Sequence, residues 1–501
     1  MNNRTIKTID PLLLAALGVT VVIHIGSLTN FLVADSWVFM VRHSFLDNFS
    51  YFFRTMLPPE HNALWLRPIP MFFFWIDSIL WPLSNWGPHL VNIVFHVVNT
   101  WLVYRITRLI TGGYESAETV SLPGFCAALC YGVHPLTVGS VAWVAARFDV
   151  MAVTFGLAGL YFWVWRDRGE TGWITAAAAF VGFFACIFSK EQGVVFLAAA
   201  IVLSAMRVFD GGERRKEGIR DILVVAGLLT VYVVWRFAAF KGWGGYLEAR
   251  HGLSLKPPAY FATALIWPWS NLFPGWIFSA RMVAAAIILV AAVWYSLRRF
   301  RISFGSFPGA CFVMAAALCV FSLATTAPNP GMTFGRIMGH AESRFALQAI
   351  AGLALMAGIA TDRFSRSLTA ARAVIVITVV LGIAGAWRTD IQNQAWCNAS
   401  ATARTIVETT IVEVPNPNPA ATFIFLDIPL TNEQWAYVFG IGLEEALNLR
   451  YPGRYDLRFL RYPTREEFRR ARPDRDYVFK YYPDRKTLDR LQAVEQNDMQ
   501  Q

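Results

Sequence analysis

Residues 11–37 read PLLLAALGVTVVIHIGSLTNFLVADSW, an apolar segment of membrane-spanning length followed at once by a carboxylate, Asp35. About 20 apolar residues in a helix cross the hydrocarbon core of a bilayer. A carboxylate at the mouth of a membrane bundle is expensive unless it is paired or used. The stretch therefore predicts a transmembrane fold and, just outside its first span, a candidate functional residue.

The composition of the whole chain agrees with a polytopic membrane protein. Of its 501 residues, 55% are hydrophobic and 16% are charged, whereas soluble domains contain about 25% charged residues. The 19 Trp and 39 Phe suit a large lipid-facing and interfacial surface. Much of the net charge of +10 lies in short loops between apolar segments. It is therefore a topology signal, and we expect the lipid bilayer as a partner and no nucleic acid.

Apolar segments predict about eleven transmembrane helices. They lie near residues 11–33, 88–110, 123–145, 150–166, 171–188, 193–206, 221–239, 281–298, 308–327, 345–360 and 371–387. With the N-terminus in the cytoplasm, every strongly basic short loop lies inside, as the positive-inside rule requires. The reverse orientation would place all of these loops outside. We expect an integral membrane protein with its N-terminus in the cytoplasm.

Two further apolar stretches are broken by proline and do not fit as ordinary spans. They are residues 68–84 and residues 258–277. Counting 258–277 as a full crossing would move the basic loop at 298–301 to the outside. Both stretches are therefore expected to be interfacial or re-entrant helices, where broken backbone is tolerated at membrane depth.

Residues 389–501 form a second, polar region after the transmembrane domain of residues 1–388. An amphipathic stretch at 391–412 precedes a strand-like run at 422–426, a helical stretch at 442–449 and a second strand-like run at 477–482. This alternation predicts a small extracytoplasmic α/β domain.

Carboxylates and basic side chains gather on the outer side of this topology. One or two carboxylates among several Arg and Lys suit an anionic lipid headgroup beside a general base. Arg binds phosphate through a two-pronged fork and Lys binds it as a point charge. A carboxylate can accept the proton of an attacking hydroxyl. This is the chemistry that a polyprenyl-phosphate sugar requires.

Each of these side chains also has a purely structural interpretation. A charged residue at a helix end often marks the interface or extends toward water, and Lys190 with Glu191 could be an ion pair at a helix end. His89, Asn92 and His96 share one helix face. They could bind a metal, but hydrogen bonding between helices is the favoured interpretation. Asp77 lies in an apolar stretch and is left without a role.

Four blocks between about residues 35 and 350 resemble one membrane family. The blocks are Arg67-Pro68-Ile69 with His89-Leu90-Val91-Asn92 and His96; His134-Pro135 with Val141-Ala142 and Arg147-Phe148-Asp149-Val150; Ser189-Lys190-Glu191-Gln192-Gly193; and Glu342-Ser343-Arg344-Phe345. In this order they are similar to the motifs of the transmembrane, tetratricopeptide-associated O-mannosyltransferase-like (dolichyl-phosphate-mannose mannosyltransferase-like) branch of the GT-C glycosyltransferases.

The resemblance implies a GT-C fold, a donor sugar on dolichyl or undecaprenyl phosphate, and inverting transfer on the outer face to a hydroxyl of a protein, glycan or lipid. It makes Asp35 the match for the catalytic acid of the first outer loop and Asp149 the matched second carboxylate. On this resemblance we expect a bacterial inner (plasma) membrane protein whose substrate-binding residues are Arg67, His89, His134, Arg147, Lys190, Glu191, Glu342 and Arg344. Of these, Arg67, Arg147, Lys190 and Arg344 are expected to bind the lipid phosphate, and Glu342 with Asp149 to orient the sugar or the basic side chains. The paired-Asp metal site of other GT-C branches is not evident, so we expect no metal and no other cofactor.

The chain also departs from the family pattern. Ala34-Asp35 stands where the family tends to have paired acids, Thr137 and Gly139 stand where it tends to have a second His and a Glu, and no tetratricopeptide repeats follow. These departures leave the sugar and the acceptor open. They also leave two other functions open: a non-catalytic GT-C relative that docks or assembles other subunits, and a transporter or flippase for a lipid-linked sugar.

Overall fold

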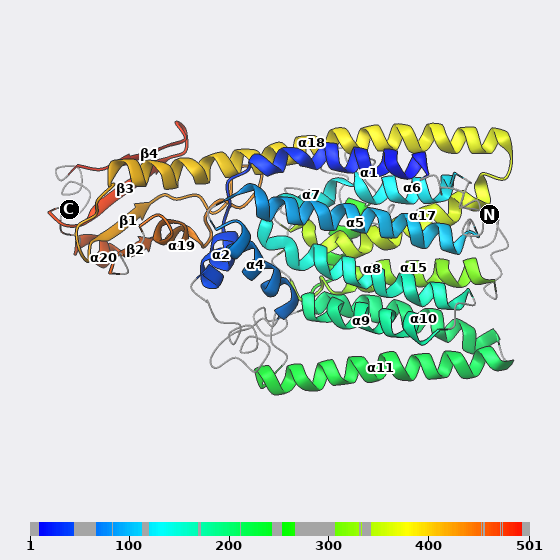
Figure 1. Cartoon of the computed structure of the whole chain (residues 1–501). Coiled ribbons are helices and arrows are strands. Elements are labelled where there is room, and N and C mark those ends of the chain that lie inside the picture. The colour runs from blue at the N-terminus through cyan, green and yellow to red at the C-terminus, as the bar shows by residue number, and fades with distance from the viewer. Residues whose placement is uncertain are drawn as a thin grey trace, which may run out of the picture.

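A computed structural model gives the structure of the chain. It describes residues 10–44, 67–82, 84–112, 120–168, 172–210, 212–242, 253–265, 306–329, 332, 342–451, 453, 456–470, 472 and 474–492. In this part of the chain, long helices run side by side as a bundle, and a small sheet lies beyond one end of the bundle (Figure 1).

The bundle contains helices at ten of the eleven expected spans. Its helices are α1 (Pro11–His24), α5 (Trp86–Ile110), α6 (Leu122–Gly132), α7 (Val138–Ala142), α8 (Arg147–Asp167), α9 (Trp173–Ser189), α10 (Val194–Asp210), α11 (Gly212–Phe240), α15 (Phe307–Ala324), α17 (Leu347–Phe364) and α18 (Leu368–Glu413). Among the described residues, eight helical stretches are long and apolar enough to cross a membrane. The prediction of an all-α polytopic membrane domain is confirmed, while the span expected at 281–298 lies outside the described residues.

The expected span at 123–145 is interrupted. α6 ends at Gly132, and the chain continues through a short 3-10 helix, η2 (Pro135–Thr137), into α7 at an angle of 52°. Pro135 explains the break, because a proline removes one backbone donor and clashes with the preceding turn. Counted as one broken span, this pair raises the number of candidate crossings in the described residues to nine.

The two proline-broken stretches begin with short helices. α4 (Pro68–Leu80) has 13 residues, which is roughly 20 Å and too short to cross a bilayer. Of the stretch 258–277, the structure describes only the part in α13 (Lys256–Leu265). Figure 1 shows α4 and the preceding α2 (Asp35–Ser44) at the end of the bundle that faces the sheet.

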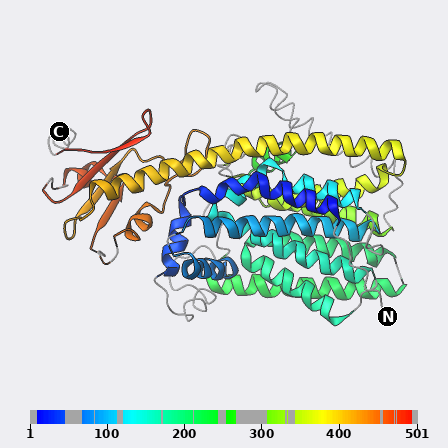
Figure 2. The ribbon, with the colours of Figure 1, turned by 45° about the horizontal axis from the view of Figure 1, so that its top comes forward.

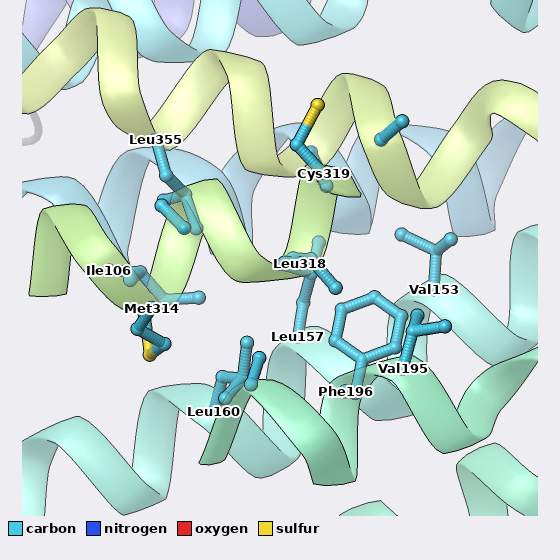
Figure 3. Close-up of a cluster of buried hydrophobic side chains, with 14 of the residues drawn as sticks. Ile106, Val153, Leu157, Leu160, Val195, Phe196, Met314, Leu318, Cys319 and Leu355 are labelled. Carbon is cyan, nitrogen blue, oxygen red and sulfur yellow. The ribbon is translucent and has the colours of Figure 1, made fainter. Parts of the chain in front are cut away.

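Small residues and interlocking apolar side chains hold the bundle together. A Cβ atom added at Gly182 of α9 would lie 2.7 Å from the backbone nitrogen of Gly159 in α8, so these two backbones approach each other closely. Figure 3 shows side chains of α5, α8, α10, α15 and α17 facing one another in the buried core: Ile106, Val153, Leu157, Leu160, Val195, Phe196, Met314, Leu318, Cys319 and Leu355.

α18 connects the bundle to the sheet as one continuous helix (Figure 2). Its 46 residues span roughly 70 Å. The first half exposes apolar residues such as Val376 and Ile383, whereas the second half buries Trp396, Ala403 and Val407. The helix therefore passes from a lipid-facing environment into a packed one, and it runs through residue 388 without a break. The domain boundary at that residue stays a prediction.

The sheet has four strands in the order β2-β1-β3-β4. β1 (Thr422–Leu426) is parallel to both β2 (Arg458–Arg461) and β3 (Tyr477–Tyr482), and β4 (Thr487–Arg490) is antiparallel to β3. The helices α19 (Leu443–Asn448) and α20 (Arg465–Arg469) lie in the two connections between parallel strands, as such connections require. The predicted α/β architecture and both predicted strands are confirmed. The short edge strands β2 and β4 were not predicted, because RFLR and TLDR carry no apolar run.

Candidate active site

The fold brings most of the residues singled out from the sequence to one end of the bundle. Asp35 begins α2, and Arg67 immediately precedes α4. Asp149 lies in the first turn of α8, Lys190 directly follows α9, and Glu191 begins the 3-10 helix η4 (Glu191–Gly193). Glu342 precedes η7 (Ser343–Ala346), which contains Arg344. These positions are helix ends that face the sheet in Figure 1.

A buried cluster of alternating charge forms around Asp149. Lys190 makes an ion pair with Asp149, and their side chains are 1% and 2% exposed. The Nε atom of Arg344 lies 3.9 Å from Oδ2 of Asp149, and its Nη2 atom lies 3.8 Å from Oε2 of Glu342. Arg344, at 12% exposed, is the member of this cluster with the most exposed side chain. An anion approaching the cluster from outside would therefore meet Arg344 first.

Aromatic rings surround these cations. The guanidinium carbon of Arg344 lies 4.6 Å from the ring centroid of Trp143 and 4.7 Å from that of Phe345. The Nζ atom of Lys190 lies 4.5 Å from the same Phe345 ring. Ring faces stabilise nearby cations, so these contacts favour the charged forms of both side chains.

A second ion pair lies beside this cluster. Arg67 donates from Nε to Oε2 of Glu191 at 3.0 Å and from Nη2 to Oε1 at 2.6 Å. Such a two-pronged pair fixes the start of α4 against the loop between α9 and α10. Lys190 and Glu191 therefore have different partners, Asp149 and Arg67, and do not form the local ion pair that their adjacency allowed.

Arg147 is fully buried and is bound by protein groups. Its Nη1 atom lies 2.5 Å from Oδ2 of Asp77, and its Nε and Nη2 donate to Oδ1 of Asn92 at 3.0 Å and to the carbonyl oxygen of Pro88 at 2.8 Å. The side chain is 0% exposed. The structure makes Arg147 the link between α4, α5 and α8 and gives Asp77 its partner. The phosphate contact that the sequence predicted for Arg147 stays a prediction.

The two histidines expected to contact substrate also lie inside the bundle. His89 is 2% exposed and His134 is 7% exposed. The Nδ1 atom of His134 accepts from the backbone N–H of Leu136 at 3.3 Å, which caps η2. Their contact with substrate stays a prediction. The favoured interpretation of Asn92 and His96 is confirmed, because Asn92 donates to the Trp143 carbonyl at 3.2 Å and a ring nitrogen of His96 lies 3.2 Å from the Gly132 carbonyl.

Asp35 is held in a rigid turn next to the charged cluster. The preceding Ala34 has a φ of 46°, and the indole of Trp37 donates to the Leu32 carbonyl at 2.7 Å. Burial raises the pKa of Asp35, and the positive charges of Arg344 and Arg67 partly offset this effect. The turn thus presents a carboxylate that holds a proton more readily than an exposed aspartate does.

The sheet domain contacts this turn directly, which the sequence did not predict. The backbone N–H of Ala34 donates to the Val438 carbonyl at 2.9 Å. Gly442 has a φ of 93°, and a Cβ atom there would lie 2.1 Å from the Ala34 carbonyl oxygen. Glu445, in α19, opposes Arg344 by raising the pKa of Asp35. The only local signal was the Gly440-Ile441-Gly442 sequence, which identifies a turn but not its partner.

Comparisons with known proteins place the chain beside membrane glycosyltransferases. No protein-family model matches it. A protein O-mannosyl-transferase of Caenorhabditis elegans is 26% identical over 225 residues, which are 44% of this chain and 29% of that protein. Tmtc2 of Drosophila melanogaster, another protein O-mannosyl-transferase, is 26% identical over 35% of this chain and 19% of its own length. The chain thus matches less than a third of either relative.

Solved structures share the fold over nearly the whole chain. ArnT from Cupriavidus metallidurans in the apo state has a TM-score of 0.53 at 12% identity, covering 94% of this chain and 93% of ArnT. ArnT bound to undecaprenyl phosphate has a TM-score of 0.50 at 13% identity, covering 95% and 94%. The fold is the GT-C fold, and the sequence resemblance to the O-mannosyl-transferases is confirmed.

Replacing Arg147 by Leu should destabilise the bundle strongly. The substitution leaves the Asp77 carboxylate buried and unpaired, which typically costs about 3–5 kcal/mol. The free energy of unfolding in mixed detergent micelles measures this loss. The control is Arg470→Ala in the exposed pair with Glu466, where we expect a change below about 1 kcal/mol. Equal losses in the two variants would contradict the structural role of Arg147.

Replacing Gly442 by Ala should separate the sheet domain from the Asp35 turn. Gly453→Ala is the matched control, because Gly453 also has a left-handed φ, 79°, but nothing lies within 4 Å of an added Cβ. In both variants the left-handed backbone conformation costs roughly 1–2 kcal/mol. Only Gly442→Ala adds the clash with Ala34. Hydrogen–deuterium exchange over residues 31–37 should accelerate in Gly442→Ala alone. Unchanged exchange there would rule out the contact.

Proposed function

We propose that this chain is an inverting glycosyltransferase that moves a sugar from a polyprenyl-phosphate donor to an acceptor hydroxyl at the membrane face beneath the sheet domain. The observation that carries the proposal is the position of Asp35, a half-buried carboxylate under the electrostatic influence of Arg344 and Arg67. A carboxylate that accepts a proton and cations that bind phosphate are the two parts that this transfer needs. The likeness to O-mannosyl-transferases and to ArnT supports the same reaction class.

In the proposed reaction, Asp35 accepts the proton of the acceptor hydroxyl as its oxygen attacks the anomeric carbon. The bond between that carbon and the phosphate oxygen breaks, and the lipid phosphate leaves with the electron pair. Attack from the face opposite the leaving phosphate inverts the configuration at the sugar. The raised pKa of Asp35 suits this role, because a stronger base takes a hydroxyl proton more readily.

Arg344 is the residue that we assign to the leaving phosphate. It stands at the exposed side of the cluster, and its neighbours Asp149 and Glu342 hold the guanidinium from two directions. Lys190 adds a second positive charge behind it through its pair with Asp149. Arg67 and Glu191 keep the adjacent loop in place. Within the proposal, Asp149 orients the basic residues and does not accept the proton.

The sheet domain forms the acceptor side of the proposed site. It contacts the Asp35 turn through Val438 and Gly442, and α19 brings Glu445 toward Asp35. We place this domain and the site outside the cytoplasm and the short basic loops inside it, in a bacterial plasma membrane. ArnT in one structure binds undecaprenyl phosphate, and a donor on the same type of lipid is part of the proposal, as is catalysis without a metal.

Asp35→Asn should abolish release of polyprenyl phosphate. A general base contributes about 10²–10⁴-fold to a rate, and asparagine keeps the shape of the side chain while losing the base. The measurement uses purified full-length protein in lipid with a panel of dolichyl- and undecaprenyl-phosphate sugars. It follows release of the lipid phosphate.

The matched control is Asp484→Asn, an exposed aspartate in the turn between β3 and β4, which should retain the wild-type rate. Equal release by wild type and Asp35→Asn would remove Asp35 as the base. Absence of release with every donor would favour the alternative of a non-catalytic GT-C relative that docks other subunits.

The acid side of the pH–rate profile should report the charges around Asp35. The base must be ionised, so the rate falls as the pH drops through the pKa of Asp35, which lies above its ordinary value of 3.8. Arg344→Gln removes a charge that lowers this pKa and should move the acid limb to higher pH. Glu445→Gln removes a charge that raises it and should move the limb to lower pH. Shifts in the same direction would contradict this assignment.

A further inference from the structure

A second cluster of buried charge lies at the opposite end of the bundle from Asp35. Asp221 of α11 is 2% exposed and makes ion pairs with Arg166 of α8 and with Arg207 of α10, whose Nη1 lies 2.5 Å from Oδ2 of Asp221. Arg207 also pairs with Asp167. In Figure 1, these residues belong to the ends of α8, α10 and α11 that point away from the sheet.

An apolar groove begins at this cluster and runs along the outside of the bundle between α9 and α11. Its volume is about 300 Å³, and it is lined by Trp163, Trp173, Phe180, Val224 and Leu228, with Arg166 and Arg220 also in its wall. From Arg220 to Leu228 the groove follows α11 for about 12 Å. Trp173 is 79% exposed and Val224 is 47% exposed, so the groove opens toward the lipid.

A polar hollow of about 250 Å³ adjoins the groove and shares Arg166 and Arg220 with it. Its other charged lining residues are Asp167, Arg207, Arg214 and Glu217. With Asp221 in the wall of the groove, four cationic side chains stand against three carboxylates here. The excess is therefore positive. Arg220 is 64% exposed and reaches Oδ1 of Asp221 at only 3.5 Å, so it can turn toward a bound anion.

We propose that the groove and the polar hollow together bind one anionic phospholipid of the cytoplasmic leaflet. Its phosphate would lie in the hollow against Arg220 and Arg166, and one acyl chain would follow the groove past Trp173 and Phe180. The pairing of a cationic hollow with an apolar groove matches the two halves of such a lipid. Basic pockets between transmembrane helices on the cytoplasmic side bind anionic headgroups, and arginine binds phosphate through a fork. The site is separate from the proposed active site.

Native mass spectrometry of the full-length protein tests the site, with phosphatidylglycerol and phosphatidylcholine of identical acyl chains as probes. Wild type should retain phosphatidylglycerol preferentially. Arg220→Gln should lower its retention about fivefold, the effect of one basic residue near an anionic headgroup. Arg372→Gln is the matched control, because Arg372 is an exposed arginine near the start of α18. This substitution removes the same charge at the same end of the bundle.

A second variant tests the groove without changing the charge. Ala176→Trp fills the groove from α9 and should lower phosphatidylglycerol retention while Arg220 remains in place. Equal retention of the two lipids by wild type, or equal losses in Arg220→Gln and Arg372→Gln, would overturn the proposal. Full retention in Ala176→Trp, or displacement of the lipid by millimolar inorganic phosphate, would overturn the assignment of the groove to an acyl chain.

Discussion

The Arg147 guanidinium fixes the geometry of the end of the bundle where the candidate site lies. It joins Asp77 of α4, Asn92 and the Pro88 carbonyl of α5, and its own backbone begins α8. With no exposed surface, its charge is stable only while all of these partners stay in place. Two residues further along α8, Asp149 receives Lys190. The position of the charged cluster therefore depends on this buried interaction.

The remaining charged residues near the candidate site fall into two groups: residues in tight ion pairs, and the two residues Arg344 and Asp35 beside them. Arg67 with Glu191 and Lys190 with Asp149 are tight pairs that tie α4, α8 and the loop after α9 together. Arg344 and Asp35 lie next to these pairs. The pKa of Asp35 is raised by burial and is adjusted by Arg344, Arg67 and Glu445. The pKa of the proposed base thus depends on charges from both the bundle and the sheet domain.

The two ends of the bundle offer charge in different surroundings. Near Asp35 the cations stand over aromatic rings beneath the sheet domain. At the other end, Arg166 and Arg220 border a groove that opens to lipid, and Arg207 lines the polar hollow beside it. In our two proposals, the same types of side chain serve a reacting phosphate at one end and a phospholipid at the other, because the walls around them differ. α18 adds a further asymmetry, since it is lipid-exposed over its first half and packed over its second.

The sequence by itself determined the membrane class, the positions of most helices, the strands β1 and β3, and the group of residues near the site. Hydrophobicity and strand propensity are local properties, so apolar runs and basic loops can be read without a partner. Most residues of the four motif blocks did gather at one end.

Only the tertiary structure decided which charges pair. Arg147, Asp77 and Asn92 lie tens of residues apart, and Ala34 meets Gly442 across about 400 residues of chain. No local pattern records such a contact, because whether an arginine binds a phosphate or a buried aspartate depends on what the fold brings within a few ångströms of it.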